Sequence, residues 1–309
     1  MNCKEKVYCG VDVSKLYLDV FFKGRPDRFD NTIKGVESML ARIGKVHYVL
    51  ESTGGYERMA AWKLMDAGAD VSIVNPSRVR YYALSMGQLA KTDPIDAGVI
   101  GDFAAAVHPE RSEKPTKEQR LLCALVDRRQ QLNEMRTAER SRLETAADPS
   151  FLEMVKKHLN WIENELKMLE KKIAETISTN AQMKEKNERI QRIKGLGKIC
   201  AATLLAHIPE IGTLSRQEIA ALAGLAPYNR DSGSTCRRRH IHGGRKRLRA
   251  CLYMAAVCAI QHNPAMKEFY TRLVEDNHRP KKVALTAVMR KLIIAANSAV
   301  KNPDFLVVV

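Results

Sequence analysis

The sequence lacks the long apolar runs, the paired cysteines and the nucleotide-binding glycine loops that mark several common protein classes. No apolar stretch approaches the roughly 20 residues that cross a bilayer, and the N-terminal MNCKEKVYCG lacks the apolar core of a secretory signal. The seven cysteines contain no CxxC pair, which argues against a disulfide framework or a zinc site. No GxxxxGK[ST] loop or dinucleotide-binding fingerprint is present, which argues against a kinase or nucleotide hydrolase. We expect a cytoplasmic protein with reduced thiols.

Acidic side chains are scarce in the last third of the chain. Residues 193–309 carry 19 basic and 7 acidic side chains, whereas residues 1–110 carry 14 of each, and the net charge is +16. A positive field concentrated in one region is typical of a protein that binds a polyanion. The sequence contains no basic amphipathic helix with an aromatic face, so a nucleic acid is a better partner than a membrane surface.

Four acidic residues stand where a chain could gather them around a divalent metal. Asp12 interrupts the apolar run VYCGVDV, and Glu51 ends a second run, VHYVL. Asp93 and Asp96 are three residues apart, so a helix would place both on one face. Clustered carboxylates repel one another unless a cation neutralises them, and hard oxygen ligands select Mg²⁺ or Mn²⁺. Because the rest of the chain is strongly basic, this pattern indicates metal-assisted chemistry on a nucleic-acid phosphate.

Residues 1–110 are predicted to form an α/β domain. We expect strands over 7–13, 17–22, near 28–31, ending at Glu51 and over 71–74, with helices over about 34–43, 56–67, 77–86 and 93–106. A strand meander followed by alternating helices and strands, with acids on the first strand, a later strand and the last helix, is similar to the ribonuclease-H arrangement. The expected fold is therefore RuvC-like (ribonuclease-H-like).

Residues 111–190 are predicted to be an α-helical coiled coil or hairpin. A first helix, about 116–146, is separated from a second by Asp148-Pro149-Ser150. The second helix carries apolar residues at heptad spacing: Leu152, Val155, Leu159, Ile162, Leu166, Leu169 and Ile173. Either an antiparallel hairpin within one chain or a coiled coil with a second subunit would bury these residues. The second alternative predicts a homo-oligomer, a dimer or tetramer.

Residues 191–309 are predicted to form a small, basic, mostly α-helical domain. IKGLGK precedes an apolar helix, in the form of a helix-hairpin-helix element whose free N–H groups could hold a phosphate. A polar loop then carries Ser232 and Ser234, followed by two basic clusters. A hydroxyl surrounded by arginines is well placed to attack a phosphodiester. The predicted nucleic-acid contacts are Lys194, Gly195, Gly197, Lys198, Arg237, Arg238, Arg239, Arg245, Lys246, Arg247 and Arg249.

Several ordered motifs carry a resemblance to a known family. GVDVSK, ESTGGYE and KTDPIDA, with VNPSRVR before the last, resemble the N-terminal half of the DEDD-type transposases of bacterial insertion sequences. This family includes the Piv-like invertases and the RNA-guided bridge recombinases. IKGLGKICAATLLAHIPEIG, ALAGLAPYNRDSG and GGRKRLRACLYMAA resemble its C-terminal transposase domain. The resemblance covers about 7–106 and 190–300.

The resemblance implies a site and its partners. Asp12, Glu51, Asp93 and Asp96 would form the metal-binding tetrad, with Mg²⁺ or Mn²⁺ as cofactor. Ser232 would be the nucleophile that joins covalently to DNA, with Ser234 as the alternative. An element-encoded guide RNA would pair with donor and target DNA, in the bacterial cytoplasm at the nucleoid. Because tetrad and serine lie in different domains, the serine of one chain could serve the tetrad of another.

Two other functions remain open at the level of the sequence. A metal-dependent nuclease of the Holliday-junction-resolvase type would use the tetrad to activate water, and Ser232 would be an ordinary loop residue. A non-catalytic nucleic-acid scaffold would use the four acids only structurally. Covalent attachment to DNA separates the recombinase from the nuclease, and Mg²⁺-dependent strand breakage excludes the scaffold.

Overall fold

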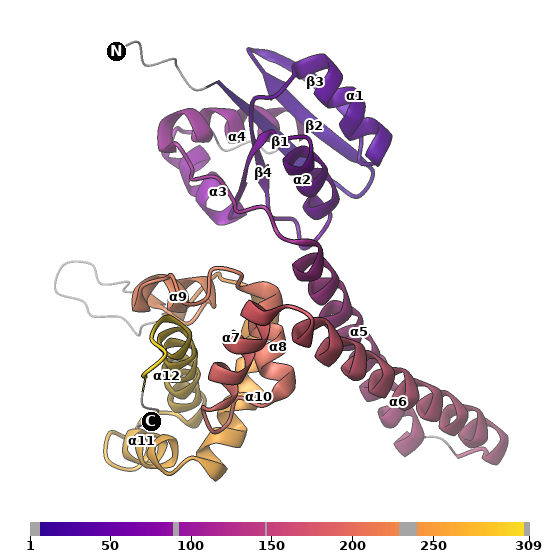
Figure 1. Cartoon of the computed structure of the whole chain (residues 1–309), viewed down its shortest axis with the longest axis vertical. Coiled ribbons are helices and arrows are strands. Elements are labelled where there is room, and N and C mark those ends of the chain that lie inside the picture. Colours follow the sequence, from indigo (N-terminus) through magenta and orange to yellow (C-terminus); the bar gives the residue numbers. More distant parts are fainter. Residues whose placement is uncertain (1–6, 89–92, 146, 229–239, 306–309) are drawn as a thin grey trace. The chain divides into compact units, whose positions relative to one another are not determined.

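The computed structural model describes residues 7–88, 93–145, 147–228 and 240–305, and the side chains of residues 93–95 and 228 are outside the description. Contacts divide the chain into two compact units, Met1–Pro115 and Thr116–Val309 (Figure 1). Each unit has hydrophobic clusters of its own.

Unit 1 is built on a five-stranded mixed sheet. Strand order is β3-β2-β1-β4-β5, in which β1, β2 and β3 form an antiparallel meander and β1, β4 and β5 run parallel. The bounds are β1 (Tyr8–Val13), β2 (Tyr17–Phe22), β3 (Arg25–Asp30), β4 (His47–Glu51) and β5 (Asp70–Val74).

Four helices cover the two faces of this sheet (Figure 1). They are α1 (Ile33–Ile43), α2 (Glu57–Asp66), α3 (Pro76–Ser85) and α4 (Asp93–Val107). Side chains alternate between faces along a strand. Val11 and Leu50 accordingly pack with α1 and α2, whereas Tyr8 and Val49 pack with α3 and α4. The face on which a strand residue lies therefore decides which pair of helices it meets.

All five strands and four helices of unit 1 occur where the sequence predicts them, with one shifted boundary. β3 begins at Arg25, earlier than the predicted 28–31, because Lys23 and Gly24 form a tight turn with φ of 50° and 76°. The turn pairs Arg25 with Phe22 at once. The sequence of β3 is polar and contains Pro26, so it lacks the apolar pattern that predicts a strand. Both features are tolerated because β3 forms one edge of the sheet.

Unit 2 begins with an antiparallel helical hairpin of α5 (Lys117–Thr145) and α6 (Pro149–Ser178). Arg129 pairs with Glu170 at 2.7 Å and Arg140 with Glu163 at 3.0 Å, so positions that advance along α5 retreat along α6. Leu132 of α5 packs against several of the heptad residues of α6, namely Ile162, Leu166 and Leu169. The hairpin alternative is thus present within the chain, and pairing with a second subunit stays a prediction.

The rest of unit 2 is a helical body. It contains α7 (Ala181–Gln191), α8 (Lys198–His207), α9 (Arg216–Leu222), β6 (Pro227–Tyr228), β7 (His240–Ile241), α10 (Lys246–His262), α11 (Pro264–Val274) and α12 (Lys281–Lys301). Its core includes Leu122 of α5 and Ile173 of α6, so the base of the hairpin shares it. The predicted domain boundaries at 110 and 190 stay predictions.

The expectation that no apolar stretch approaches the length of a membrane span is wrong for helix α12, which is long and apolar enough to cross a membrane by length and composition alone. However, 61% of its most apolar window is buried within the protein, and Leu292 and Ile293 are fully buried in the core of unit 2. Burial of this extent is typical of a central core helix in a folded domain.

Candidate functional site

Asp12 and Glu51 lie at the same level of neighbouring parallel strands. The register pairs Val11 of β1 with Leu50 of β4, and the two acids are the next residues on these strands. Parallel strands lie about 4.8 Å apart, and residues at one level point to the same face. Both side chains are half-buried. The fold therefore directs these two carboxylates to one place.

Helix α4 packs on the sheet face from which the two acids emerge. Gly10 lies two residues before Asp12, on the same face of β1. A Cβ at Gly10 would lie 2.2 Å from the Ala97 carbonyl oxygen and 2.5 Å from the Gly101 nitrogen, so only glycine permits this approach. The half-buried Asp96 directly precedes Ala97. Three of the four predicted acids are thus brought to one end of one sheet face.

Several predicted site residues lie partly or wholly outside the described residues. Asp93 is the first residue of α4, one turn before Asp96, but its side chain is outside the description. The whole of Ser232, Ser234 and Arg237–Arg239 lies there too. Their roles stay predictions.

Asp19 is an acid of this region that sequence reasoning missed. It lies directly opposite Asp12 in the antiparallel pairing of β1 with β2, and only 6% of it is exposed. Arg28 of β3 donates a hydrogen bond from Nε to Asp19 Oδ1 at 2.7 Å. The sequence signal was the same as for Asp12, a carboxylate inside an apolar strand, here YLDVFF.

Glu57 is a second buried acid, and it organises the turn that follows Glu51. Its Oε2 accepts hydrogen bonds from the backbone N–H of Thr53 (3.1 Å) and Gly55 (2.8 Å), and from the Thr53 hydroxyl (3.1 Å). Gly54 and Gly55 have φ of 80° and 129°, a conformation that favours glycine. In the motif ESTGGYE, the first acid therefore faces the site and the second holds the loop.

The described ends of the serine loop are held tightly together. β6 and β7 pair across its base. A Cβ at Gly224 would lie 2.2 Å from the Gly243 carbonyl oxygen, and one at Gly244 only 2.1 Å from the Gly224 nitrogen. Arg249 donates hydrogen bonds to the carbonyl oxygens of both Gly243 and Gly224. Backbone contact and one guanidinium group thus fix the two points from which the loop departs.

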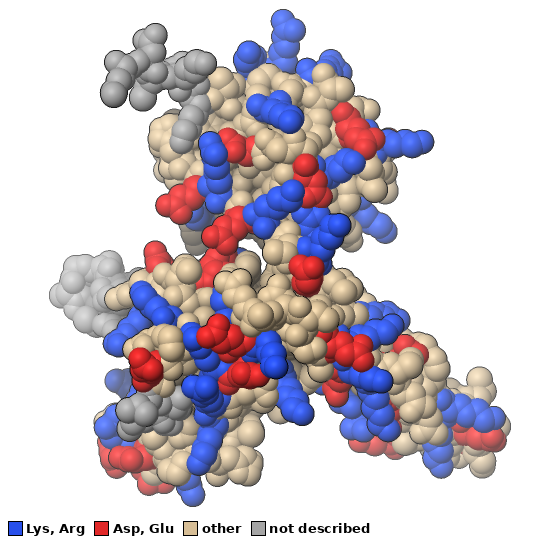
Figure 2. Space-filling view, in the orientation of Figure 1, with Lys and Arg blue, Asp and Glu red and all other residues tan. Residues whose placement is uncertain are grey.

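Two arginines of the basic run Arg245–Arg249, which follows the serine loop, make contacts within the protein. Arg245 donates to the His207 carbonyl oxygen and pairs with Glu210 at 3.3 Å, and Arg247 pairs with Asp127. Figure 2 shows acidic side chains interspersed with lysine and arginine on the visible face of unit 2. These guanidinium groups have fewer donors to offer a phosphate than the sequence implies, and their nucleic-acid role stays a prediction.

Of the two glycines before α8, Gly195 serves the packing of the chain, whereas a Cβ at Gly197 would meet nothing within 4 Å. Gly195 has φ of 108°, and a Cβ there would lie 2.6 Å from the Ala259 Cβ of α10. Gly197 is the N-cap of α8 and makes no side-chain cap hydrogen bond. Lys194 and Lys198 are both exposed. The turn therefore presents two lysines beside a helix N-terminus, an arrangement that suits a phosphate.

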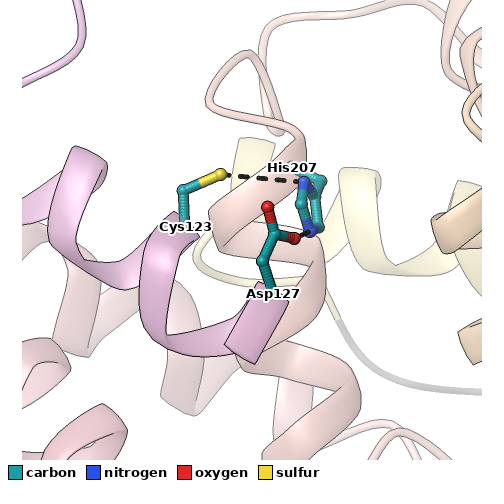
Figure 3. Close-up of side chains that lie close together, drawn as sticks. All are labelled: Cys123, Asp127 and His207. Atoms are coloured by element: carbon teal, nitrogen blue, oxygen red, sulfur yellow. Dashed lines mark hydrogen bonds and ion pairs between the residues drawn. The ribbon is translucent and has the colours of Figure 1, made fainter. Parts of the chain in front are cut away.

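Cys123, Asp127 and His207 form a cluster whose ligand-type atoms all lie within 4.8 Å of one another (Figure 3). His207 Nε2 lies 3.1 Å from Asp127 Oδ1, and its Nδ1 lies 3.9 Å from Cys123 Sγ. Arg247 also pairs with Asp127. Since both imidazole nitrogens and the carboxylate have protein partners, the cluster acts as a link between α5, α8 and α10. Residues 84 apart gave no sequence signal for it.

The described cysteines carry free thiols: Cys9, Cys123, Cys200, Cys251 and Cys258. Burial raises the pKa of Cys9 well above its usual range, so this neighbour of the acidic site stays a neutral core residue. A hydrogen bond between the Cys200 and Cys251 thiols raises the pKa of Cys200 and lowers that of Cys251. Cys9, Cys123 and Cys200 are buried, whereas Cys251 is half-buried and Cys258 is exposed.

Comparisons with known proteins agree on one kind of protein. A model of the transposase family IS116/IS110/IS902 matches residues 187–271, and a model of IS110-type DEDD transposases matches residues 9–151. The pilin gene-inverting protein of Moraxella bovis is 28% identical, over 96% of each chain. That of Moraxella lacunata shows the same identity and coverage. The first model spans the glycine turn and serine loop, and the second spans the acidic site.

Proposed function

The chain belongs to the DEDD-type transposases of the IS110 family, and we propose that it cuts and rejoins DNA strands with an acidic metal site and a serine nucleophile. The family implies DNA as substrate and a divalent metal as cofactor. The observation that carries the proposal is the convergence of Asp12, Glu51 and Asp96 at one end of one sheet face. The strand order of unit 1 supports a RuvC-like fold.

The donor set fits Mg²⁺, with Mn²⁺ as its substitute. Asp12 and Glu51 offer carboxylate oxygens from adjacent strands, and Asp96 offers another from the helix packed on them. Asp93 would complete the set. Oxygen ligands of this kind select hard cations. A bound ion would polarise the scissile phosphate and stabilise the charge that develops on it.

The serine step is proposed at Ser232. Its Oγ would attack phosphorus, forming an Oγ–P bond while the bond from phosphorus to the leaving deoxyribose oxygen breaks. The proton of the serine hydroxyl ends on that oxygen. The phosphoserine link keeps the energy of the broken bond, so a second DNA hydroxyl can reverse the step and rejoin the strand without ATP. The clamped base of the loop supports this role, because an attacking group must be held in position.

RNA guidance is a further part of the proposal. It rests on the resemblance to the bridge recombinases and on the excess of basic side chains in residues 193–309. Purification from cells with sequencing of the bound RNA tests it. A discrete RNA encoded beside the reading frame supports guidance, and a heterogeneous RNA background counts against it.

A homo-oligomer, a dimer or tetramer with shared sites, is also proposed. The α5–α6 hairpin leaves Met154, Trp161 and Met168 exposed at seven-residue spacing on α6. A second copy of this hairpin is the expected partner. Mixing a chain that lacks the tetrad with a chain that lacks Ser232 should restore activity if sites are shared, and no activity in any mixed assembly contradicts sharing.

The alternative is a nuclease of the Holliday-junction-resolvase type, in which the acids activate water. The match to DEDD transposases suits this chemistry well, because it covers residues 9–151, which include the four acids and exclude Ser232. The two mechanisms differ in whether DNA becomes attached to the protein.

Comparison of Ser232→Ala with Ser234→Ala on end-labelled DNA tests the serine. We expect Ser232→Ala to bind DNA but to form no labelled protein on a denaturing gel and no rejoined product. Ser234→Ala should form both the labelled protein and the rejoined product, and Asp12→Asn should form neither of them. Normal cleavage by Ser232→Ala would overturn the serine mechanism and support the nuclease.

A further inference from the structure

Three exposed apolar side chains lie at the end of the sheet that carries the acidic site. Leu16 is in the turn after β1, Ile33 begins α1, and Tyr56 immediately precedes α2. Each is more than half exposed. β1 ends one residue past Asp12 and β4 ends at Glu51, and β3 runs in the same direction as β1. The segments that carry the three side chains therefore leave the sheet at this end, and we call Leu16, Ile33 and Tyr56 the apolar rim.

Asn31 joins the segments that carry the rim. Its backbone N–H donates a hydrogen bond to the Leu16 carbonyl oxygen at 2.8 Å. Its side-chain Nδ2 donates to the carbonyl oxygens of Ser14 at 2.8 Å and of Tyr56 at 3.2 Å. Ile33 is only two residues further along the chain. The turn after β1, the end of β3 and the loop after β4 are thus linked through one asparagine.

The backbone at Tyr56 is held from two sides. The buried Glu57 carboxylate accepts hydrogen bonds from the N–H groups of Thr53 and Gly55 in the preceding loop. Asn31 holds the carbonyl oxygen of Tyr56 itself. An aromatic side chain has few rotatable bonds, so an exposed ring on a fixed backbone gives a large contact surface at a low cost in conformational entropy.

The charges within the rim segments are basic. Residues 14–17 and 31–34 contain two lysines, Lys15 and Lys34, and no acidic residue, and both lysines are exposed. Exposed rings combined with lysines are typical of surfaces that bind single-stranded nucleic acid, because the rings stack on unpaired bases and the lysines contact phosphates. A continuous duplex hides the faces of its bases. The rim therefore favours a strand in which a base is unpaired.

We propose that Tyr56 stacks on an unpaired nucleobase of the DNA strand that is cut at the acidic site, with Leu16 and Ile33 as apolar neighbours of that base. Lys15 and Lys34 would contact the adjoining phosphates. The inference rests on the proposed function, in which DNA binds at these acids. It adds a substrate class, namely DNA that is melted or branched beside the scissile bond. Stacking tolerates every base, so the rim selects the structure of the DNA and not its sequence.

The test uses two probes of equal charge: a single-stranded thymidine oligonucleotide and an abasic oligonucleotide of the same length. Both offer phosphates, but only the first offers bases. Tyr56→Ser should weaken binding of the thymidine strand by about tenfold and leave binding of the abasic strand unchanged. Tyr56→Phe keeps the ring and should bind both strands as the wild-type chain does. Fluorescence anisotropy with the full chain and Mg²⁺ measures these affinities.

A 2-aminopurine base within the thymidine strand gives a local readout, because stacking quenches its fluorescence. Binding to the wild-type chain should quench it, and binding to Tyr56→Ser should quench it less. Tyr56→Ser should fold, since Tyr56 is the N-cap of α2 and serine is favoured at that position. Thermal unfolding checks this expectation.

Two further variants separate stacking from charge. Tyr81→Ser is the matched control, because Tyr81 is at least as exposed as Tyr56 but lies on α3, outside the rim. It should change neither affinity. Lys15→Gln should weaken binding of both strands and lower the slope of log affinity against log salt by about 0.7, the value for one phosphate contact on a single strand. Tyr56→Ser should leave that slope unchanged.

The outcomes distinguish this inference from the proposed function. Equal loss of affinity for both strands in Tyr56→Ser, or equal binding of both strands by the wild-type chain, would overturn the stacking role and leave covalent attachment through Ser232 untouched. A changed oligomeric state of Tyr56→Ser with unchanged strand binding would also overturn it and would make the rim a protein contact. If Asp12→Asn cleaves normally while Tyr56→Ser loses only the thymidine strand, the proposed function fails and the base contact stands.

Discussion

Arg249 of α10 donates a hydrogen bond to the backbone carbonyl of Gly243, the point at which the chain returns from the serine loop. The same guanidinium group reaches the Gly224 carbonyl on the outgoing side. An arginine in a basic cluster is usually interpreted as a phosphate ligand. Here the guanidinium group instead joins the two backbone segments at the base of the loop, at Gly224 and at Gly243.

Arg249→Gln should reduce strand rejoining by at least about tenfold while leaving DNA affinity nearly unchanged, since misplacement of a reacting group is costly. The neighbouring exposed Lys246 provides the comparison. Lys246→Gln should weaken binding and spare the chemistry of the bound complex. Binding isotherms and single-turnover cleavage separate the two effects. Equal losses of affinity in both variants would show that Arg249 is a phosphate ligand after all.

Gly10→Ala should disrupt the acidic site, although Gly10 is not one of the four acids and precedes Asp12 by two positions in the sequence. The added methyl group meets backbone atoms of Ala97 and Gly101, so α4 must move away from β1 and carry Asp96 with it. Overpacking of this kind costs about 1–3 kcal/mol of folding free energy. Denaturant unfolding and Mg²⁺-dependent cleavage measure both consequences, and cleavage should fall.

Gly98→Ala is the matched control on the same helix. A Cβ at Gly98 would meet only Phe21 ring atoms at 3.8 Å or more, an ordinary contact. Alanine is about 1 kcal/mol better than glycine inside a helix, so stability should rise or stay equal and cleavage should persist. Destabilisation of both variants to the same extent would contradict the special contact at Gly10.

Glu57→Gln should destabilise unit 1 by about 1–3 kcal/mol, because three hydrogen bonds to a buried carboxylate are weakened. Thermal unfolding measures the loss. Glu37→Gln removes an exposed carboxylate that pairs with Lys63, and a surface pair of this kind contributes at most about 1 kcal/mol. A smaller effect at Glu57 than at Glu37 would contradict the structural role of Glu57.

Lys194→Gln and Lys198→Gln should weaken nucleic-acid binding, and each should lower the slope of log affinity against log salt by about one phosphate contact. Arg247→Gln should instead destabilise unit 2, because it removes a charged partner of Asp127, which also pairs with His207. Binding at several salt concentrations and thermal unfolding distinguish these effects. An unchanged salt slope in both lysine variants would remove the glycine turn from the proposed interface.

The strands and helices of unit 1 were predictable because alternation and helical periodicity are local properties of the chain. The edge strand β3 was placed least well, since Arg25–Asp30 is polar and its strand character comes from pairing with β2. The candidate ligands Asp12 and Glu51 were also visible, because a carboxylate in or beside an apolar run is costly to bury unless it is paired or binds a cation. Asp93 and Asp96 were visible through their helical spacing.

The sequence by itself determined the family, the acids and the basic C-terminal third, because motifs and charge are written in residue order. Tertiary structure alone placed Asp19 opposite Asp12, brought Asp96 to β1 through Gly10, and engaged Arg245, Arg247 and Arg249 within the protein. Strand register and helix packing join residues far apart in the chain. Which charges face the substrate and which hold the fold is therefore decided only when the chain folds.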